Sequence, residues 1–109
     1  MSDISGSGPI SPRERRMYEQ EYKHSAELFQ KALEQSAKSD NQYQQEQFGE
    51  VMGKAMDVLN QTAQGLKRKD LMEQNSKIAA DYQAYQSSPA DEARRAKLNQ
   101  DLDRAKHSF

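Results

Sequence analysis

The chain has 109 residues, enough for one domain, but only 34% of them are hydrophobic and the mean hydropathy is -1.16. Sixteen basic and seventeen acidic residues leave a net charge of -1, which disfavours binding to nucleic acid or to an anionic membrane surface through bulk charge. The absence of cysteine excludes disulfides and thiolate metal sites. No run reaches the roughly 18 apolar residues of a membrane span, and no secretory signal is visible, so we expect a cytoplasmic protein.

The composition favours helices. Thirteen glutamines accompany only five glycines and three prolines, and the remaining residues are mostly good helix formers. We therefore predict an all-α fold, either an elongated helical hairpin or a small three-to-four-helix bundle with coiled-coil-like packing. Because so little apolar surface is available to offset chain entropy, we expect a protein partner or self-association to supply further burial.

The N-terminal segment 1–10 is rich in serine and glycine and lacks periodicity, so we expect a disordered arm followed by one helical domain over 11–109. Ser11 and Pro12 are typical N-cap and first-turn residues, and Glu14 completes a capping box. A stripe of apolar residues at helical spacing then predicts a helix over 12–38. The polar run that follows it predicts a turn.

The next apolar series predicts a helix over 42–86. It contains Phe48, Val51, Met52, Ala55, Met56, Leu59, Ala63 and Leu66, and it resumes with Leu71, Ile78, Tyr82 and Tyr85. Gly49 and Gly53 interrupt it. They either weaken the helix or, because they lie four residues apart, allow a neighbouring helix to approach closely.

The apolar series loses its phase between Leu66 and Leu71. One interpretation makes Gly65 a helix C-cap and Asp70 the start of a new capping box with Glu73; the other is a continuous helix whose apolar seam drifts around its surface. Good helix formers fill the gap, so we favour the continuous helix.

A proline marks the last turn. Ser88 and Pro89 predict a helix end near residue 86 and, with Ser88 as N-cap, a final helix over 89–106. Leu98, Leu102, Ala105 and Phe109 lie on one narrow face of it. We expect this helix to fold back on the preceding one as a thin hairpin that leaves one apolar side to be covered.

No catalytic or ligand-binding signature is present. His24 and His107 are far apart in the sequence and have no second ligand at metal-site spacing, so both are interpreted as surface residues. The basic clusters at 13–16, 67–69 and 94–95 are short and flanked by acids, which favours ion pairing on helix surfaces over phosphate binding. We therefore predict a protein that is not an enzyme and that uses no cofactor or metal.

The segments that carry a resemblance to a known family are the helix end at 78–85, the turn at 87–91 and the start of the last helix at 96–102. Together they resemble the helix-turn-helix of needle subunits in bacterial type III secretion systems. Inner-rod subunits and the small helical chaperones of these systems are similar. The resemblance implies cytoplasmic storage of an aggregation-prone partner by helix-on-helix burial, or export without a signal if the chain is needle-like.

The leading hypothesis is therefore a non-enzymatic helical protein, a secretion chaperone or needle-like component, that buries amphipathic helices against a partner. The predicted partner-binding residues are Phe48, Val51, Met52, Ala55, Leu59, Leu66, Ile78, Tyr82, Tyr85, Leu98 and Leu102. For the methionine-bearing stripe of Val51, Met52 and Met56, packing against the first or last helix in the chain's own core is the alternative. A structural coiled-coil homodimer and, less favoured, a nucleic-acid-binding helix pair are the competing functions.

Overall fold

The computed structural model describes residues 10–109, and within this range it contains four helices and no strand. The helices are α1 (Pro12–Lys38), α2 (Gln42–Leu66), α3 (Lys69–Ser87) and α4 (Glu92–Lys106). The predicted all-α small bundle is confirmed. The predicted disordered arm lies outside the described residues except for Ile10, which is half-buried and packs against the core.

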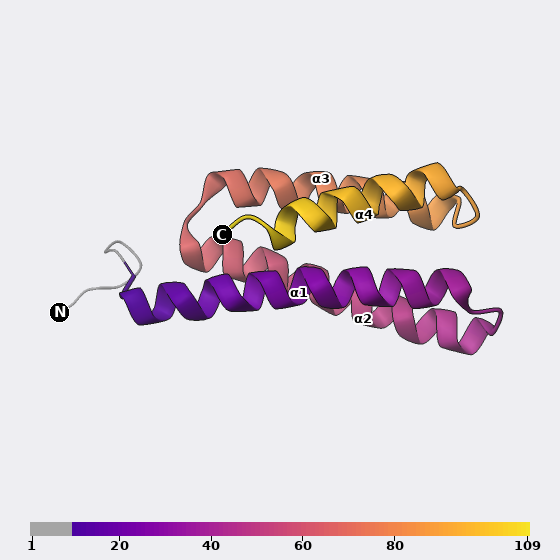
Figure 1. Cartoon of the computed structure of the whole chain (residues 1–109), viewed down its shortest axis with the longest axis horizontal. Helices are drawn as coiled ribbons and strands as arrows, with labels where there is room; N and C mark the ends of the chain where they lie inside the picture. The colour runs from indigo at the N-terminus through magenta and orange to yellow at the C-terminus, as the bar shows by residue number, and fades with distance from the viewer. Residues whose placement is uncertain (1–9) are drawn as a thin grey trace.

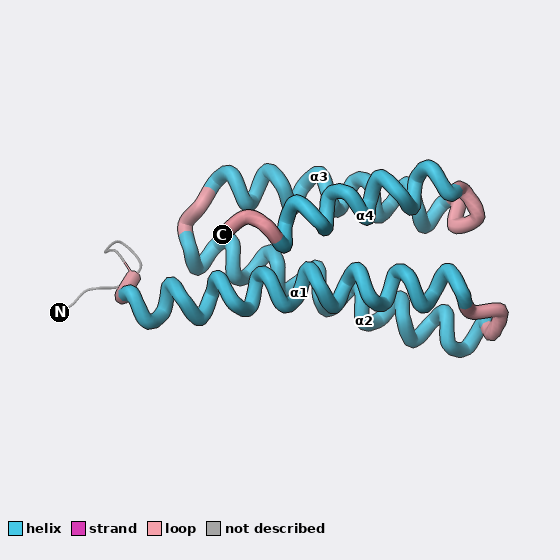
Figure 2. Tube along the Cα trace, in the orientation of Figure 1, coloured by secondary structure: helices cyan, strands magenta, loops and turns pink. Residues whose placement is uncertain are grey.

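The helices form two antiparallel hairpins that pack as two layers (Figure 1). In one layer α1 runs beside α2, and in the other α3 runs beside α4. Between the layers α1 contacts α4 and α2 contacts α3, so the chain passes up and down around a bundle measuring 54 × 23 × 20 Å. The short turns shown in Figure 2 produce this arrangement, because a connection of a few residues forces consecutive helices to be antiparallel neighbours.

The first two helices begin at side-chain caps. Ser11 Oγ accepts a hydrogen bond from the Glu14 amide at 3.1 Å, and its hydroxyl donates to Glu14 Oε1. The predicted helix start is thus confirmed. Asn41 Oδ1 accepts from the amide of Tyr43 at 2.8 Å and caps α2 in the same way. Local side-chain chemistry therefore fixes where each of these two helices begins.

The start of the last helix was predicted three residues too early. Asp91, and not Ser88, is the N-cap of α4, and its Oδ1 accepts from the amides of Ala93 and Arg94 at 3.0 and 3.4 Å. Ser88 is instead the C-cap of α3, where its amide donates to the carbonyl of Tyr85. The carboxylate of Asp91 is the better acceptor at a helix N-terminus, since the helix dipole favours negative charge there.

The prediction of a continuous helix through residues 65–70 was wrong. Helix α2 ends at Leu66, and Lys67 adopts a left-handed conformation with φ 56°. The amide of Arg68 then donates to the carbonyl of Ala63, as in a helix C-terminal cap. The break has a packing cause: a step of five residues would put Leu66 and Leu71 about 140° apart on one helix, whereas the turn buries both.

The cap at this break also differs from the predicted one. Lys67 occupies the position proposed for Gly65, and the expected capping box is absent because α3 starts after Arg68 without a side-chain cap. Asp70 pairs with Arg68 instead, with 2.6 Å between the guanidinium and Oδ2. The charged pair therefore lies at the start of α3.

The glycines of α2 have different roles from those predicted. A Cβ built on Gly49 or Gly53 meets no atom within 4 Å, so the close-packing interpretation of this pair is wrong. Close approach occurs at Gly65, where a Cβ would lie 2.7 Å from Cζ of Tyr18 on α1. The α1–α2 contact near the break therefore depends on a missing side chain.

The core draws on all four helices. Sixteen hydrophobic residues are buried in one cluster, among them Phe29, Leu59, Ile78 and Leu102 at 0% exposure. Helix α1 covers the apolar side that the α3–α4 hairpin was expected to leave open, as the edge-to-face contact of Phe29 with Tyr82 illustrates. The chain thus has a core of its own, and further burial against a partner stays a prediction.

Candidate partner-binding groove

The structure uses most of the predicted partner-binding residues for internal packing. Eight of the eleven are buried in the core: Met52, Ala55, Leu59, Leu66, Ile78, Tyr85, Leu98 and Leu102. Phe48, Val51 and Tyr82 are half-buried and pack against the edge of this core. The core-packing alternative for the methionine-bearing stripe therefore describes Met52 fully and Val51 in part. Direct contact with a partner stays a prediction, and among the eleven residues the three half-buried ones are the most accessible for it.

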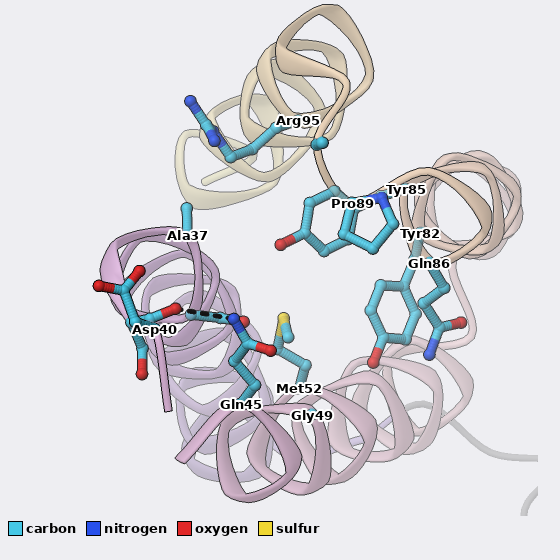
Figure 3. A pocket seen from close by; sticks show the side chains of 13 residues that line it. Ala37, Asp40, Gln45, Gly49, Met52, Tyr82, Tyr85, Gln86, Pro89 and Arg95 are labelled. Atoms are coloured by element: carbon cyan, nitrogen blue, oxygen red, sulfur yellow. Dashed lines mark hydrogen bonds between the residues drawn. The ribbon is translucent and has the colours of Figure 1, made fainter. Parts of the chain in front are cut away.

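One end of the bundle is hollow. A cavity of about 560 Å³ lies where the α1–α2 turn and the α3–α4 turn come together, and all four helices contribute to its wall. We call it the end groove. Figure 3 shows it along the bundle, with Ala37, Gly49, Met52, Tyr82, Tyr85 and Arg95 around it. The groove is therefore an opening of the core at the end opposite the α2–α3 break.

The floor of the groove is apolar. Tyr82 and Tyr85 are three residues apart, so α3 directs both rings to the same side, and Met52 faces them from α2 (Figure 3). The ring of Tyr82 rests edge-on against Phe29, with 5.1 Å between the ring centroids. Met52 and Tyr85 are almost fully buried in the core, so of these three side chains the half-buried ring of Tyr82 is the one that a partner side chain could contact directly.

The α2 wall of the groove is low because it has no side chain at Gly49. The space around this residue is open, with no atom within 4 Å of the point that a Cβ would occupy. The turn beside it is held in place by Gln45, whose Nε2 donates to the carbonyl of Ser39 at 2.7 Å. One edge of the groove is therefore the hydrogen-bonded α1–α2 turn, and next to it α2 presents only backbone at Gly49.

Two charges of opposite sign stand at the groove. Arg95 on α4 is half-buried and has no ion pair with any residue of the described range 10–109, while Asp40 is exposed at the α1–α2 turn. Burial, and then the neighbouring Tyr85, raises the pKa of Tyr82 above 10, so its phenol is neutral at physiological pH. The groove therefore offers apolar contact, a neutral hydroxyl and one unpaired cation.

Four polar residues are buried, namely Ser25, Thr62, Asn75 and Asp101, and the burial of Asp101 was not predicted from the sequence. Asn75 is 1% exposed and Asp101 is 4% exposed, and both lie in the helix interfaces. Helical spacing contained the signal: Asp101 follows Leu98 by three residues and precedes Ala105 by four, which places it on the apolar face. Because aspartate is polar, Asp101 does not count as part of an apolar stripe.

The remaining sequence features lie on the surface. His24 and His107 are exposed, and residues 10–109 contain no group of three or more side chains suited to a metal ion. Arg68 pairs with Asp70 and Arg94 pairs with Asp91, in keeping with the ion-pair interpretation of the basic clusters at 67–69 and 94–95. Among the described helices, none combines the length and apolar character that crossing a membrane requires.

Comparisons with protein-family models, with curated proteins and with solved structures find no match to this chain.

Proposed function

We propose that this protein is a non-enzymatic interaction module that seats an amphipathic helix of another protein in the end groove. The observation that supports the proposal is the opening at one end of the bundle, where the half-buried ring of Tyr82 lies beside the core residues Met52 and Tyr85. Docking of an amphipathic helix into an apolar groove between helices is a common mode of recognition.

The charges at the groove specify the chemistry of the partner. Arg95 has no counter-ion within the described residues, so an acidic side chain on the partner helix would complement it. Asp40, exposed at the α1–α2 turn, favours a basic side chain beside it. The expected ligand is thus a helix with one apolar face, flanked by an acid and a base, and not a small molecule.

A role in type III secretion is the specific form of this proposal that the resemblance of residues 78–102 implies. In that form the partner is an export substrate stored in the cytoplasm or, for a needle-like component, a neighbouring subunit. The homodimer is the competing possibility, in which the helix in the groove belongs to a second copy of this chain.

Matched glycine variants test the groove. Gly49→Glu adds a charged side chain to the α2 wall, and Gly53→Glu adds the same side chain one turn further along α2, away from the groove lining. Both sites are open, so we expect both variants to fold and to gain about 1 kcal/mol of helix propensity. The substitutions then differ mainly in where they place the carboxylate.

The measurement is co-purification from native cells with the wild type and both variants, followed by titration of the purified partner into each. We expect one helical protein to bind the wild type and Gly53→Glu and to bind Gly49→Glu at least about tenfold more weakly. Equal binding to both variants would exclude the groove. Sedimentation of the wild type over a concentration series identifies the homodimer, which would associate without any other protein.

A further inference from the structure

Two carboxyl groups meet in the interface between α3 and α4. Asp101 on α4 is 4% exposed and lies within hydrogen-bond reach of Asp81 on α3. The Oδ2 atoms of both residues are buried and have no hydrogen-bond partner among the described residues. Buried carboxylate oxygens normally accept hydrogen bonds, so the pair as two ionised groups would be left with unmet acceptors and mutual repulsion.

The surrounding cations are exposed to solvent and only weakly offset the charges of the buried Asp101 and the partly buried Asp81. Lys97 Nζ lies 3.7 Å from Asp81 Oδ1, but its side chain is 60% exposed. Lys77 from α3 and Arg104 from α4 act on Asp101 from a shallow surface hollow that Asp70 and Glu73 also line. On the α1 side of α4, a different hollow is lined by the titratable residues His24, Glu27, Lys31 and Glu34 together with Lys106.

We propose that Asp81 and Asp101 hold one proton between them across the α3–α4 interface, and that loss of this proton loosens the packing of α4 against α3. The shared proton turns one carboxyl into a donor for the other and removes one negative charge from the interface. The hollow at Asp101 provides the route by which the proton exchanges with water.

The titration of Asp101 supports this arrangement. Burial, and then the hydrogen bond and charge of Asp81, raise the pKa of Asp101 from 3.8 to about 6. Because this pKa is higher in the folded chain than in the unfolded chain, the folded state binds more protons between these values. The contribution of the pair to stability is therefore greatest below about pH 4 and is lost as the pH rises through 6.

Urea unfolding from about pH 4 to pH 7.5 tests the shared proton. Asp101→Asn keeps the shape and supplies a permanent N–H donor to Asp81, so it mimics the protonated pair. We expect the ratio of the unfolding constants of wild type and Asp101→Asn to rise about 100-fold over this range. Asp103→Asn is the control, because Asp103 is exposed on the same helix and pairs with Lys106 at 3.2 Å. It should retain the wild-type rise.

Parallel pH curves for the wild type and Asp101→Asn would overturn the proposal. If this variant fails to fold, the carboxyl carbon resonance of Asp101 in the wild type decides the question: an inflection near pH 6 supports the shared proton, and one near pH 4 overturns it.

Hydrogen exchange tests the loosening of α4. After correction for intrinsic rates, we expect amides of α4 to lose about tenfold more protection than amides of α1 between about pH 5 and pH 7.5 in the wild type, but not in Asp101→Asn. Equal losses in both helices would overturn the local effect. These readouts require no partner and are independent of the binding proposed for the end groove.

Discussion

The hydroxyl of Tyr22 on α1 donates to Oδ1 of Asn75 on α3 at 2.7 Å, across the centre of the bundle. Asn75 in turn donates from Nδ2 to the carbonyl of Leu59 on α2 at 2.9 Å, and Gln74 donates to the Tyr22 hydroxyl at 3.0 Å. This buried network ties three helices together through fixed donor and acceptor positions. It therefore specifies the register of α1 against α3, which apolar contacts alone would leave less defined.

Removing the hydroxyl tests that network. Tyr22→Phe should lower the free energy of unfolding by about 1 to 3 kcal/mol, because Asn75 Oδ1 would remain buried without its donor. Urea unfolding at one fixed pH measures the change. Tyr43→Phe is the matched control, since Tyr43 is 66% exposed, and it should change stability by less than about 0.5 kcal/mol. A neutral Tyr22→Phe would show that water or Gln74 replaces the hydroxyl.

The contact between Gly65 and Tyr18 predicts opposite outcomes for alanine at two glycines. Gly53→Ala should stabilise the chain by about 1 kcal/mol, because helix propensity rises and the site is open. Gly65→Ala should give no net gain, because its Cβ would sit 2.7 Å from the Tyr18 ring and must displace it. Thermal unfolding of the two variants makes the comparison.

A double-mutant cycle identifies the cause of that difference. If the Tyr18 ring is the obstacle, Gly65→Ala in a Tyr18→Ala background should recover most of the expected gain of about 1 kcal/mol. A penalty that persists without the ring would place the constraint in the backbone at the end of α2.

The left-handed conformation of Lys67 predicts a stabilising substitution at the break. Lys67→Gly should raise the free energy of unfolding by up to about 1 kcal/mol, because φ 56° costs a residue with a side chain more than it costs glycine. Lys54→Gly, at an exposed position inside α2, should lower it by a similar amount. Differential scanning calorimetry of both variants would reveal opposite shifts in Tm. Two downward shifts would show that the side chain of Lys67 contributes more than its backbone costs.

Local signals predicted most of the fold. Ser11 and Asn41 lie where side-chain capping requires them, and the apolar stripes through Phe29, Leu59 and Leu98 mark the faces that form the core. These features depend on residues within a turn or two of one another, so one sequence is sufficient to identify them. The all-α class and the approximate ends of α1 and α3 follow from such signals.

The break at Lys67 and the end groove depend on tertiary structure. Propensity favoured a continuous helix there, but burying both Leu66 and Leu71 requires a turn, and this advantage exists only when the core is formed. The groove likewise combines Met52, Tyr82 and Arg95 from three helices, and their meeting depends on how the two hairpins diverge. Sequence periodicity described each helix but not the space between them.

Acid-side stability should depend on a different pair of carboxylates from the one in the α3–α4 interface. Hydrogen bonding to Arg68 lowers the pKa of Asp70, and hydrogen bonding to Lys106 and then Gln30 lowers the pKa of Asp103. A pKa that is lower in the folded chain contributes stability above the ordinary value of 3.8, and this contribution disappears as the pH falls through the folded value. Asp101 has the opposite dependence, because its pKa of about 6 is raised.

We therefore expect the urea midpoint of the wild type to be highest between about pH 4 and pH 5 and to fall on both sides. Combining Asp70→Asn with Asp103→Asn should flatten the dependence of the urea midpoint on pH below about pH 4 only, and Asp101→Asn should flatten it above about pH 5 only. A midpoint that rises steadily to about pH 7 would contradict the assignment of the raised pKa to Asp101.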